Sequence, residues 1–297
     1  MIDVSIIIIN YNTLALTLDC LSSIYKKTQG ISYEIIVVDN NSSICPLDEI
    51  KRNYNNVIVI KSSENLGFGK ANNLGSEYAN GKYLFFLNSD TILFNNAISI
   101  LFNFIENNLI PKIGAVGGNL FTINNEPNYS YSLHFPSIWR IILYRLRFSK
   151  IFKDDFFNNS EIPKKVNIII GADLLIEREL FNKIGKFDPF YFMYIEDGDL
   201  QYQLHKLNYT IYNVPDAKII HLQGASSTTG EKMIMEIDSY YYFFKKNGFN
   251  PLFYLYIEFL FASFFYTIFF YNKTKQNNYR KLIIHIYNEY IFTKVNK

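Results

Sequence analysis

Residues 82–91, KYLFFLNSDT, combine a short apolar run with an abrupt polar end. The apolar part, residues 83–87, has the length of one strand, and such a run bounded by polar residues is typical of a strand covered on both faces. Ligands of open α/β sheets bind outside the carboxyl ends of such strands. This stretch therefore places Asp90 where a carboxylate could hold a hard divalent cation. Alternatively, Asn88, Ser89 and Asp90 serve only as turn and cap residues.

Apolar runs and helical patterns alternate before this stretch. Further strands are predicted at residues 4–9, 33–38 and 57–60. Leucine and isoleucine recur at helical spacing over residues 14–24, with Asn12 or Thr13 as the N-cap, and residues 74–78 also look helical. Alternating units of this kind predict an α/β fold with a mostly parallel sheet and helices on both of its faces.

Polar clusters follow three of the predicted strands, at residues 10–12, 39–42 and 88–90. The carboxyl ends of parallel strands share one edge of a sheet, so we expect the three clusters to converge there and to favour a nucleotide site. The glycine-containing stretch 67–73 could approach a ligand closely, with Lys70 as a cation, or could be the first turn of a helix. It matches neither a Walker loop nor the dinucleotide fingerprint.

Composition restricts the class of protein. The chain has 297 residues, of which 49% are apolar and 18% are aromatic. Its formal net charge is only +2, and it has no recognisable RNA- or DNA-reading signature. We therefore expect no nucleic-acid partner. Cys20 and Cys45 are too few for a disulfide framework and suit a reducing compartment. The apolar run 4–9 follows Asp3 rather than a basic segment and has no cleavage site, so we expect no export signal and a cytoplasmic location.

The middle of the chain is less regular. A glycine-rich strand is predicted at residues 114–121. Residues 124–147 mix basic and aromatic residues, which could face an acceptor or an anionic lipid headgroup. Alternatively, they form a solvated loop and a basic helix face. Residues 150–165 are charged and rich in asparagine, which predicts a mobile loop. Another strand is predicted at residues 166–172.

Residues 187–200, FDPFYFMYIEDGDL, place an aromatic segment before an acidic pair, Glu196 and Asp197, at the start of a helix over residues 200–207. A carboxylate beside an aromatic wall is partly desolvated and becomes a better general base. Alternatively, Asp197 caps the helix and Glu196 faces solvent. Two short strands, 210–214 and 217–220, then lead to His221, which by itself could be an ordinary core or surface histidine.

Seven segments together carry a resemblance to a known family. They are VSIIIINYN (4–12), IIVVDNNSS (35–43), NLGFGKANNLG (65–75), GKYLFFLNSDT (81–91), GADLLI (171–176), EDGDL (196–200) and HLQGASS (221–227). In this order they resemble the family 2 nucleotide-sugar glycosyltransferases, and more narrowly their bacterial rhamnosyltransferase-like branch. The resemblance implies a GT-A fold, which is Rossmann-like, an activated-sugar donor and a metal-assisted, inverting transfer.

The resemblance also implies which residues bind the donor. Asp39 matches the acid that reads the pyrimidine base, and Asn10 and Asn12 match the loop that lines the same nucleoside pocket. The remaining positions match residues beside the donor phosphates and ribose or against the acceptor side of the pocket: Asn65, Gly67, Asn72, Ser89 and Gly171.

The same resemblance implies the metal ligands and the base. Asp90 matches the metal-binding aspartate of a DxD-type motif, whose first acidic position is Asn88 here, so metal binding rests on fewer carboxylates. A single carboxylate suits Mg²⁺ or Mn²⁺ that also binds phosphate and water, and such an ion stabilises the departing nucleoside diphosphate. His221 matches a histidine that contacts the metal or the diphosphate. Asp197 matches the general base that deprotonates the acceptor hydroxyl.

The last part of the chain changes character. A polar and aromatic helix is predicted over residues 231–246, and an apolar segment with one acid, Glu258, over residues 252–271. This segment is just long enough to span a bilayer. Its phenylalanine and tyrosine content suits an interfacial position. The flanking lysine and arginine residues suit an anionic membrane surface. Monotopic attachment, a membrane span and an oligomer interface remain open. We therefore expect a catalytic domain, 1–227, and a helical membrane-associating or oligomerising segment, 228–297.

The functional hypothesis is a cytoplasmic enzyme at the inner face of the cell membrane. It would transfer rhamnose or another hexose from a dTDP- or UDP-sugar to a cell-surface glycan or a lipid-linked acceptor. A polyprenyl-phosphate sugar synthase of the same fold would need cations near Asp197, for which only residues 140–147 are candidates. A processive synthase is disfavoured because the Gln-x-x-Arg-Trp element is absent. A non-catalytic nucleotide-sugar binding module is disfavoured because it would need no base, and a homo-oligomer is possible.

Overall fold

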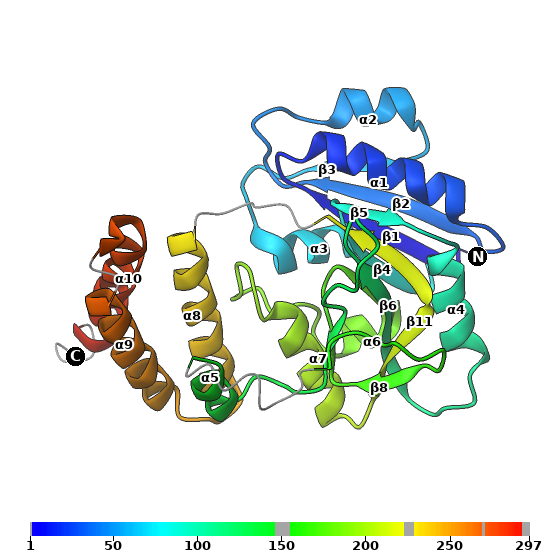
Figure 1. Cartoon of the computed structure of the whole chain (residues 1–297). Coiled ribbons are helices and arrows are strands. Elements are labelled where there is room, and N and C mark those ends of the chain that lie inside the picture. The colour runs from blue at the N-terminus through cyan, green and yellow to red at the C-terminus, as the bar shows by residue number, and fades with distance from the viewer. Residues whose placement is uncertain (1, 146–154, 223–228, 269–270, 293–297) are drawn as a thin grey trace. The chain divides into compact units, whose positions relative to one another are not determined.

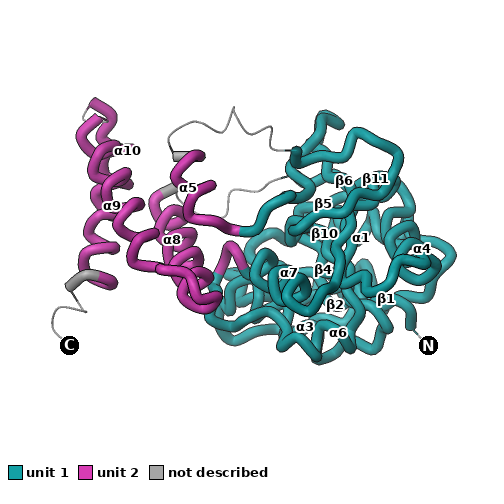
Figure 2. Tube along the Cα trace, turned by 90° about the horizontal axis from the view of Figure 1, so that it is seen from below, with its two compact units in different colours: residues 1–135, 154–192, 196–224 teal, residues 136–153, 193–195, 225–297 magenta. Residues whose placement is uncertain are grey.

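The computed structural model describes residues 2–145, 155–222, 229–268 and 271–292. The chain forms two compact units, coloured separately in Figure 2. The first unit comprises residues 1–135, 154–192 and 196–224, and the second comprises residues 136–153, 193–195 and 225–297. The described residues 136–145 and 193–195 group with the C-terminal helices. The division into a catalytic domain, 1–227, and a C-terminal segment, 228–297, stays a prediction.

The first half of unit 1 alternates strands and helices as predicted. Its elements are β1 (Val4–Asn10), α1 (Leu14–Lys27), β2 (Tyr33–Asp39), α2 (Leu47–Asn53), β3 (Ile58–Lys61), α3 (Gly67–Glu77), β4 (Tyr83–Asn88) and β5 (Thr91–Leu93). The order of the strands in the sheet begins β3-β2-β1-β4, and all three of these pairings are parallel. These strands lie side by side in Figure 1. In such a doubly wound arrangement the carboxyl ends of the parallel strands share one edge of the sheet.

The second half of unit 1 completes the sheet with mixed pairings. Its elements are α4 (Ala97–Asn107), β6 (Ile113–Phe121), β7 (Tyr131–Ser132), β8 (Lys164–Val166), β9 (Ile168–Ile169), β10 (Asp173–Glu177), α6 (Arg178–Lys183), α7 (Glu196–Lys206) and β11 (Thr210–His221). The sheet continues β4-β10-β6-β11-β5, with β8 beside β11. β10 is antiparallel to both β4 and β6, and β11 is antiparallel to β5 and β8, whereas β6 and β11 pair in parallel. The predicted parallel order is therefore continuous only from β3 to β4.

Helices cover both faces of the sheet, as the buried strands predicted. Alternate residues of a strand point to opposite faces. Ile6 and Ile8 of β1 belong to one buried cluster with residues of α1 and α4, whereas Ile7 belongs to a second cluster with residues of α3, α6 and α7. Two apolar layers, one on each face of the sheet, therefore pack the helices against β1 and β4.

Several elements differ from the sequence prediction. Helix α2 was not predicted, because only Ile50 on it is buried and so short a helix has no apolar periodicity. Residues 166–172, predicted as one strand, are divided among β8, β9 and a turn. The two strands predicted around Pro215 are one strand, β11, whose register shifts between Asn213 and Lys218. Proline lacks an N–H group, which explains why the ladder is irregular there without ending.

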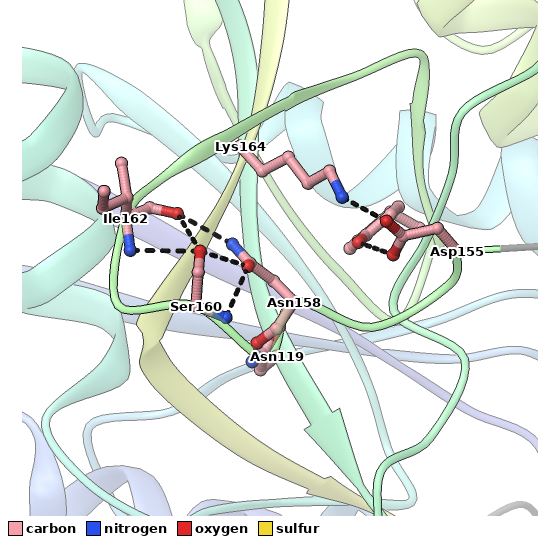
Figure 3. Close-up of polar contacts among 7 residues, drawn as sticks. Asn119, Asp155, Asn158, Ser160, Ile162 and Lys164 are labelled. Carbon is pink, nitrogen blue, oxygen red and sulfur yellow. Dashed lines mark hydrogen bonds and ion pairs between the residues drawn. The ribbon is translucent and has the colours of Figure 1, made fainter.

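The described part of the predicted mobile loop is tied down by polar contacts (Figure 3), while residues 150–154 lie outside the described residues. Asn158 Nδ2 donates to the Ile162 carbonyl at 2.9 Å, and Asn119 Nδ2 donates to the Asn158 carbonyl at 2.8 Å. Asp155 accepts hydrogen bonds from Lys164 and from the Tyr131 hydroxyl. This asparagine-rich stretch is ordered because side-chain amides bind backbone groups that no helix or strand partner would otherwise satisfy.

Unit 2 consists of helices. They are α5 (Ile138–Arg145), α8 (Thr229–Lys246), α9 (Pro251–Ile268), α10 (Lys273–Ile286) and a π-helical turn, η3 (Tyr287–Phe292). Phe243, Phe244 and Tyr254 are buried between α8 and α9. Among the described residues, only α9 is long and apolar enough to cross a membrane.

Candidate active site

The first two polar clusters meet through direct hydrogen bonds. Strand register places Asn10 opposite Asp39, and Asn10 Nδ2 donates to Asp39 Oδ1 at 3.0 Å and to the Ser42 hydroxyl at 3.0 Å. The same hydroxyl accepts from the backbone N–H of Asn12 at 2.9 Å, and Asn12 adopts a left-handed conformation with φ of 57°. The convergence expected for Asn10, Asn12 and Asp39 is present in the structure.

Asp39 has an unusual environment for a carboxylate. Its side chain is completely buried, and within the described residues its Oδ2 atom has no hydrogen-bond partner. A buried polar atom without a partner is costly, and such atoms occur where a ligand or water completes the site. The orphaned oxygen can accept a hydrogen bond from a ligand N–H group.

The third cluster joins the first through two hydroxyls. Strand register places Ile9 opposite Asn88, and the Ser89 hydroxyl lies 3.1 Å from the Thr13 hydroxyl. Thr13 occupies the N-cap position of α1 as predicted, but its side chain makes no capping hydrogen bond. Instead, its hydroxyl donates to Asn10 Oδ1 at 3.3 Å. Thr13 therefore links Ser89 to the Asn10–Asp39 pair rather than stabilising the helix end.

The glycine-containing stretch forms the start of α3, and its approach to a ligand stays a prediction. Gly67 is its first residue, with φ of +75°, and a Cβ atom there would lie 2.0 Å from the Phe192 carbonyl oxygen. Phe68 donates a backbone hydrogen bond to that same oxygen at 2.9 Å. The close approach requires glycine at this position.

A residue that the sequence analysis did not single out holds this helix start. Asn40 Nδ2 donates to Asn65 Oδ1 at 2.9 Å and to the Gly67 carbonyl at 3.1 Å, while its Oδ1 accepts from the Leu66 N–H at 2.8 Å. Asn40 follows Asp39 directly, so the acid at the end of β2 and the start of α3 are positioned together. Asn72 lies apart from this network, because its amide donates to the Phe68 carbonyl within α3 at 3.1 Å.

Asp90 and His221 come together from two adjacent strands. Thr91 of β5 lies opposite His221 of β11, and the His221 Nε2 atom lies 3.3 Å from Asp90 Oδ1. The Asn88 amide lies 3.4 Å from the same nitrogen. Both Asp90 and His221 are mostly buried, with 15% and 13% of their side chains exposed.

The donor set at this edge fits a divalent cation that shares its coordination with a ligand. A carboxylate oxygen and an imidazole nitrogen converge, and the described residues contain no group of three or more histidine, cysteine or acidic side chains that could form a complete metal site. Mg²⁺ binds through one or two carboxylates, with phosphate oxygens and water at its other positions, and Asp90 supplies one such carboxylate. Asp90 and His221 would hold the ion.

Asp197 lies at the start of α7 beside the same edge of the sheet. Its Oδ2 accepts the backbone N–H of Gly171 at 2.8 Å, and its Oδ1 accepts that of Gly198 at 2.7 Å. The Ala172 carbonyl, one residue after Gly171, accepts the N–H of Asn88 at 3.0 Å. The segment around Gly171 therefore connects Asp197 to the end of β4, two residues from Asp90.

Burial raises the pKa of Asp197 above its ordinary value, and the hydrogen bonds from Gly171 and Gly198 oppose this rise only in part. A carboxylate with a raised pKa is a stronger base than an exposed one. Its neighbour Glu196 is only 5% exposed, and no described residue bonds to its Oε2 atom. Burial, together with the charge of Asp197, raises the pKa of Glu196 to about 8. The solvent-facing alternative for Glu196 is therefore wrong.

Comparison with known proteins identifies the family. A model of glycosyl transferase family 2 matches residues 5–185, which include most of the residues described above. The chain belongs to glycosyl transferase family 2. The transferase is also 36% identical over 76 residues to the N-acetylglucosaminyl-diphospho-decaprenol L-rhamnosyltransferases of two Mycobacterium tuberculosis strains, CDC 1551 / Oshkosh and ATCC 25618 / H37Rv. This match covers 26% of the transferase and spans about a quarter, 24%, of the length of these relatives.

The fold of the transferase resembles that of a solved structure, the crystal structure of GalNAc-T7 with UDP, GalNAc and Mn²⁺. The TM-score is 0.64 at 17% identity, over 82% of the transferase and 48% of that chain. This likeness confirms the GT-A fold that the sequence resemblance implied. The roles of individual site residues in the transferase remain predictions.

Proposed function

We propose that this transferase moves a sugar, rhamnose or another hexose, from a dTDP- or UDP-linked donor to a hydroxyl group with inversion at the anomeric carbon. The acceptor would be a cell-surface glycan or a lipid-linked saccharide at the cytoplasmic face of the membrane. The observation that carries the proposal is the connection of Asp197, through Gly171 and Ala172, to the strand end that bears Asp90. A base and a phosphate-side group are thereby close to one another, as group transfer requires.

The residues divide the reaction between them. The orphaned Oδ2 atom of Asp39 would accept the N3–H group of uracil or thymine, a donor that cytosine lacks. Mg²⁺ or Mn²⁺ bound by Asp90 and His221 would offset the negative charge that develops on the departing nucleoside diphosphate. Asp197 would take the acceptor hydroxyl proton while that oxygen bonds to the anomeric carbon and the bond to the diphosphate oxygen breaks.

The proposal is tested by a thermal-shift panel of the purified chain with dTDP, UDP, CDP and GDP, each with Mg²⁺, Mn²⁺ or chelator. A nucleotide at 100 times its dissociation constant should add roughly 2.7 kcal/mol to the free energy of unfolding. We expect stabilisation by dTDP or UDP that requires the metal. It should be lost in Asp90→Ala and retained in Asp19→Ala, which removes an exposed acid on α1.

Each result of the panel has a consequence. No response to any nucleotide would overturn the donor site, and a metal-independent response that survives Asp90→Ala would overturn the metal site. Asp39→Asn should reduce the preference for dTDP and UDP over CDP. The cations that the polyprenyl-phosphate synthase alternative needs are not among the described residues of unit 1 around Asp197, since Arg140 belongs to unit 2 and Arg147 lies outside the described residues.

A further inference from the structure

Helix α9 has two chemically distinct faces. Leu252, Tyr256, Leu260, Phe264 and Ile268 recur at every fourth position and are 46–60% exposed. We call these five residues the apolar stripe. Only 22% of the residues of the helix are buried, namely Tyr254, Leu255, Glu258 and Ala262 on the opposite face. The exposed face is therefore apolar along the full length of the helix, whereas the buried face carries the only acid.

Helix α10 packs along α9, and its charges restrict how α9 can associate with a membrane. The Phe265 and Tyr279 rings stack at a centroid distance of 5.5 Å, and Gln276 Nε2 donates to the Tyr266 carbonyl at 3.5 Å. α10 nevertheless has four exposed basic residues: Lys273, Lys275, Arg280 and Lys281. If α9 crossed a bilayer, its partner helix would carry these charges into hydrocarbon, which is costly.

Helix α5 of the same unit extends the apolar stripe. Trp139 is 69% exposed, and its ring centroid lies 6.4 Å from that of Phe253, which is 40% exposed on α9. Tryptophan and tyrosine are the residues that concentrate at the level of the lipid headgroups. Trp139, Phe253 and Tyr256 therefore form one end of a continuous aromatic surface.

The exposed charges of α9 and α10 are of one sign. From Pro251 to Ile286 the single acidic residue is Glu258, which is buried, whereas the four basic residues of α10 are exposed. A second copy of the chain that docked symmetrically through α10 would bring these cations against one another. An anionic lipid surface offers the opposite charge and an apolar layer beneath it.

We propose that α9 lies in the plane of an anionic membrane surface and inserts the apolar stripe, with Trp139 and Phe253, at the level of the headgroups and upper acyl chains. The inference deepens the membrane partner in the proposed function, but it stands on unit 2 alone and does not depend on the transfer reaction. It selects monotopic attachment among the three arrangements that the sequence left open.

The native chain reports on this surface without a label, because Trp139 is its only tryptophan. Adding vesicles that contain phosphatidylglycerol should shift Trp139 emission to shorter wavelength, and lipids brominated on the upper acyl chain should quench it. Vesicles of phosphatidylcholine alone should give a weaker response. No change in emission together with no cosedimentation would overturn the proposal, and it would do so whether or not the protein transfers sugar.

Variants separate the apolar and electrostatic contributions. Tyr256→Glu with Leu260→Glu should reduce vesicle partitioning at least about tenfold, since both side chains would leave the acyl region. Leu109→Glu is the matched control, because Leu109 is 99% exposed in unit 1 and lies outside the apolar stripe. Lys273→Gln and Lys275→Gln should each reduce binding about fivefold, on anionic vesicles only. Equal loss in the Leu109 control would contradict the assignment.

The topology is tested in membranes from producing cells. In a Cys45→Ser background, which removes the exposed thiol, Lys245→Cys and Thr274→Cys place single exposed thiols before and after α9. An impermeant maleimide should label both from the same side of the membrane. Labelling from opposite sides would show a span. A dimer in solution that Tyr256→Glu converts to a monomer, without vesicle binding by the native chain, would show a second copy instead.

Discussion

The backbone N–H of Gly171 donates a hydrogen bond of 2.8 Å to Oδ2 of Asp197. A side chain at position 171 would approach this oxygen, because a Cβ atom there would lie 3.2 Å from it. Gly171 thus leaves room for the carboxylate while fixing one of its oxygens, and Gly198 fixes the other at 2.7 Å. A carboxylate held at both oxygens by backbone groups has one preferred orientation, which suits a base that acts on a positioned hydroxyl.

Asp197→Asn should abolish turnover while leaving donor binding intact. The amide cannot accept the acceptor proton, and loss of a general base typically costs between about 10²- and 10⁴-fold in rate. Single-turnover transfer and nucleotide thermal shift, measured on the same preparation, check both parts. Asp199→Asn on the same helix turn is the control, because Asp199 is buried but is not the predicted base. If Asp197→Asn turned over normally, the base would lie elsewhere.

The parts of this site that could be predicted are those written in local sequence. The runs that end at Asn10, Asp39 and Asn88 each show a strand followed by polar residues, and parallel pairing then brings them together. The role of Asn40 could not be predicted in the same way. Its partners Asn65 and Gly67 lie 25 and 27 residues away, and only the folded β2–α3 connection brings them within hydrogen-bonding distance.

Two other features, the start of α3 and the burial of Glu196, also depend on residues that are distant in the sequence. The start of α3 was predicted only as an alternative because its sequence, GFGKANN, has poor helix propensity and no apolar period, whereas the hydrogen bond from the Phe68 N–H to the Phe192 carbonyl stabilises the turn. A solvent-facing Glu196 was considered as an alternative because a residue at a helix start is usually solvated. Here the helix start is covered, and Glu196 is buried against the Gly69 backbone.

Glu196→Gln should raise the free energy of unfolding at neutral and mildly alkaline pH. The folded-state pKa of Glu196 is raised from 4.5 to about 8, so the unfolded chain loses this proton more readily than the folded chain. The native protein should therefore lose stability as pH rises from about 4.5 to about 8, and the variant should not show that part of the slope. We expect the free energy of unfolding of Glu196→Gln to exceed that of the native protein by a few kcal/mol, to order of magnitude, near pH 8 and to differ little from it near pH 4.

Thermal melts of both proteins across this pH range check the Glu196 prediction. Glu179→Gln, which changes an acid in the first turn of α6 for which no such burial exists, is the control. A constant difference between Glu196→Gln and the native chain at every pH would mean that packing, and not the titration of Glu196, causes the effect.

Gly67→Ala should destabilise the protein far more than Gly30→Ala. Both glycines have positive φ, +75° and +81°, so alanine costs about 1–2 kcal/mol of backbone strain at either position. At Gly67 the added methyl group would also meet the Phe192 carbonyl oxygen at 2.0 Å, whereas at Gly30 nothing lies within 4 Å. Urea denaturation of the two variants measures the difference directly. Equal losses would show that the close approach of α3 to Phe192 is relaxed in solution.

The Asp238 carboxylate links two elements of unit 2. Its Oδ1 atom accepts the Tyr290 hydroxyl at 2.5 Å and lies 2.7 Å from His285 Nε2. The hydrogen bond with Asp238 raises the pKa of His285 above its ordinary value of 6.5. The protonated pair therefore stabilises the fold fully below about pH 6.5, and this contribution is lost as pH rises through the raised pKa.

Asp238→Asn should consequently cost more stability at pH 6 than at pH 8.5. Because Asp238 is 38% exposed, solvent screens the pair, and we expect the pH-dependent part to be about 1 kcal/mol or less. Melting temperatures of the native chain, Asp238→Asn and His285→Gln across this range measure it. The two variants should lose the same pH dependence, since each removes one half of the pair. A pH-dependent loss in Asp238→Asn that persists in a His285→Gln background would contradict the assignment to His285, because burial and Asp238 raise the pKa of Tyr290 and keep its hydroxyl neutral in this range.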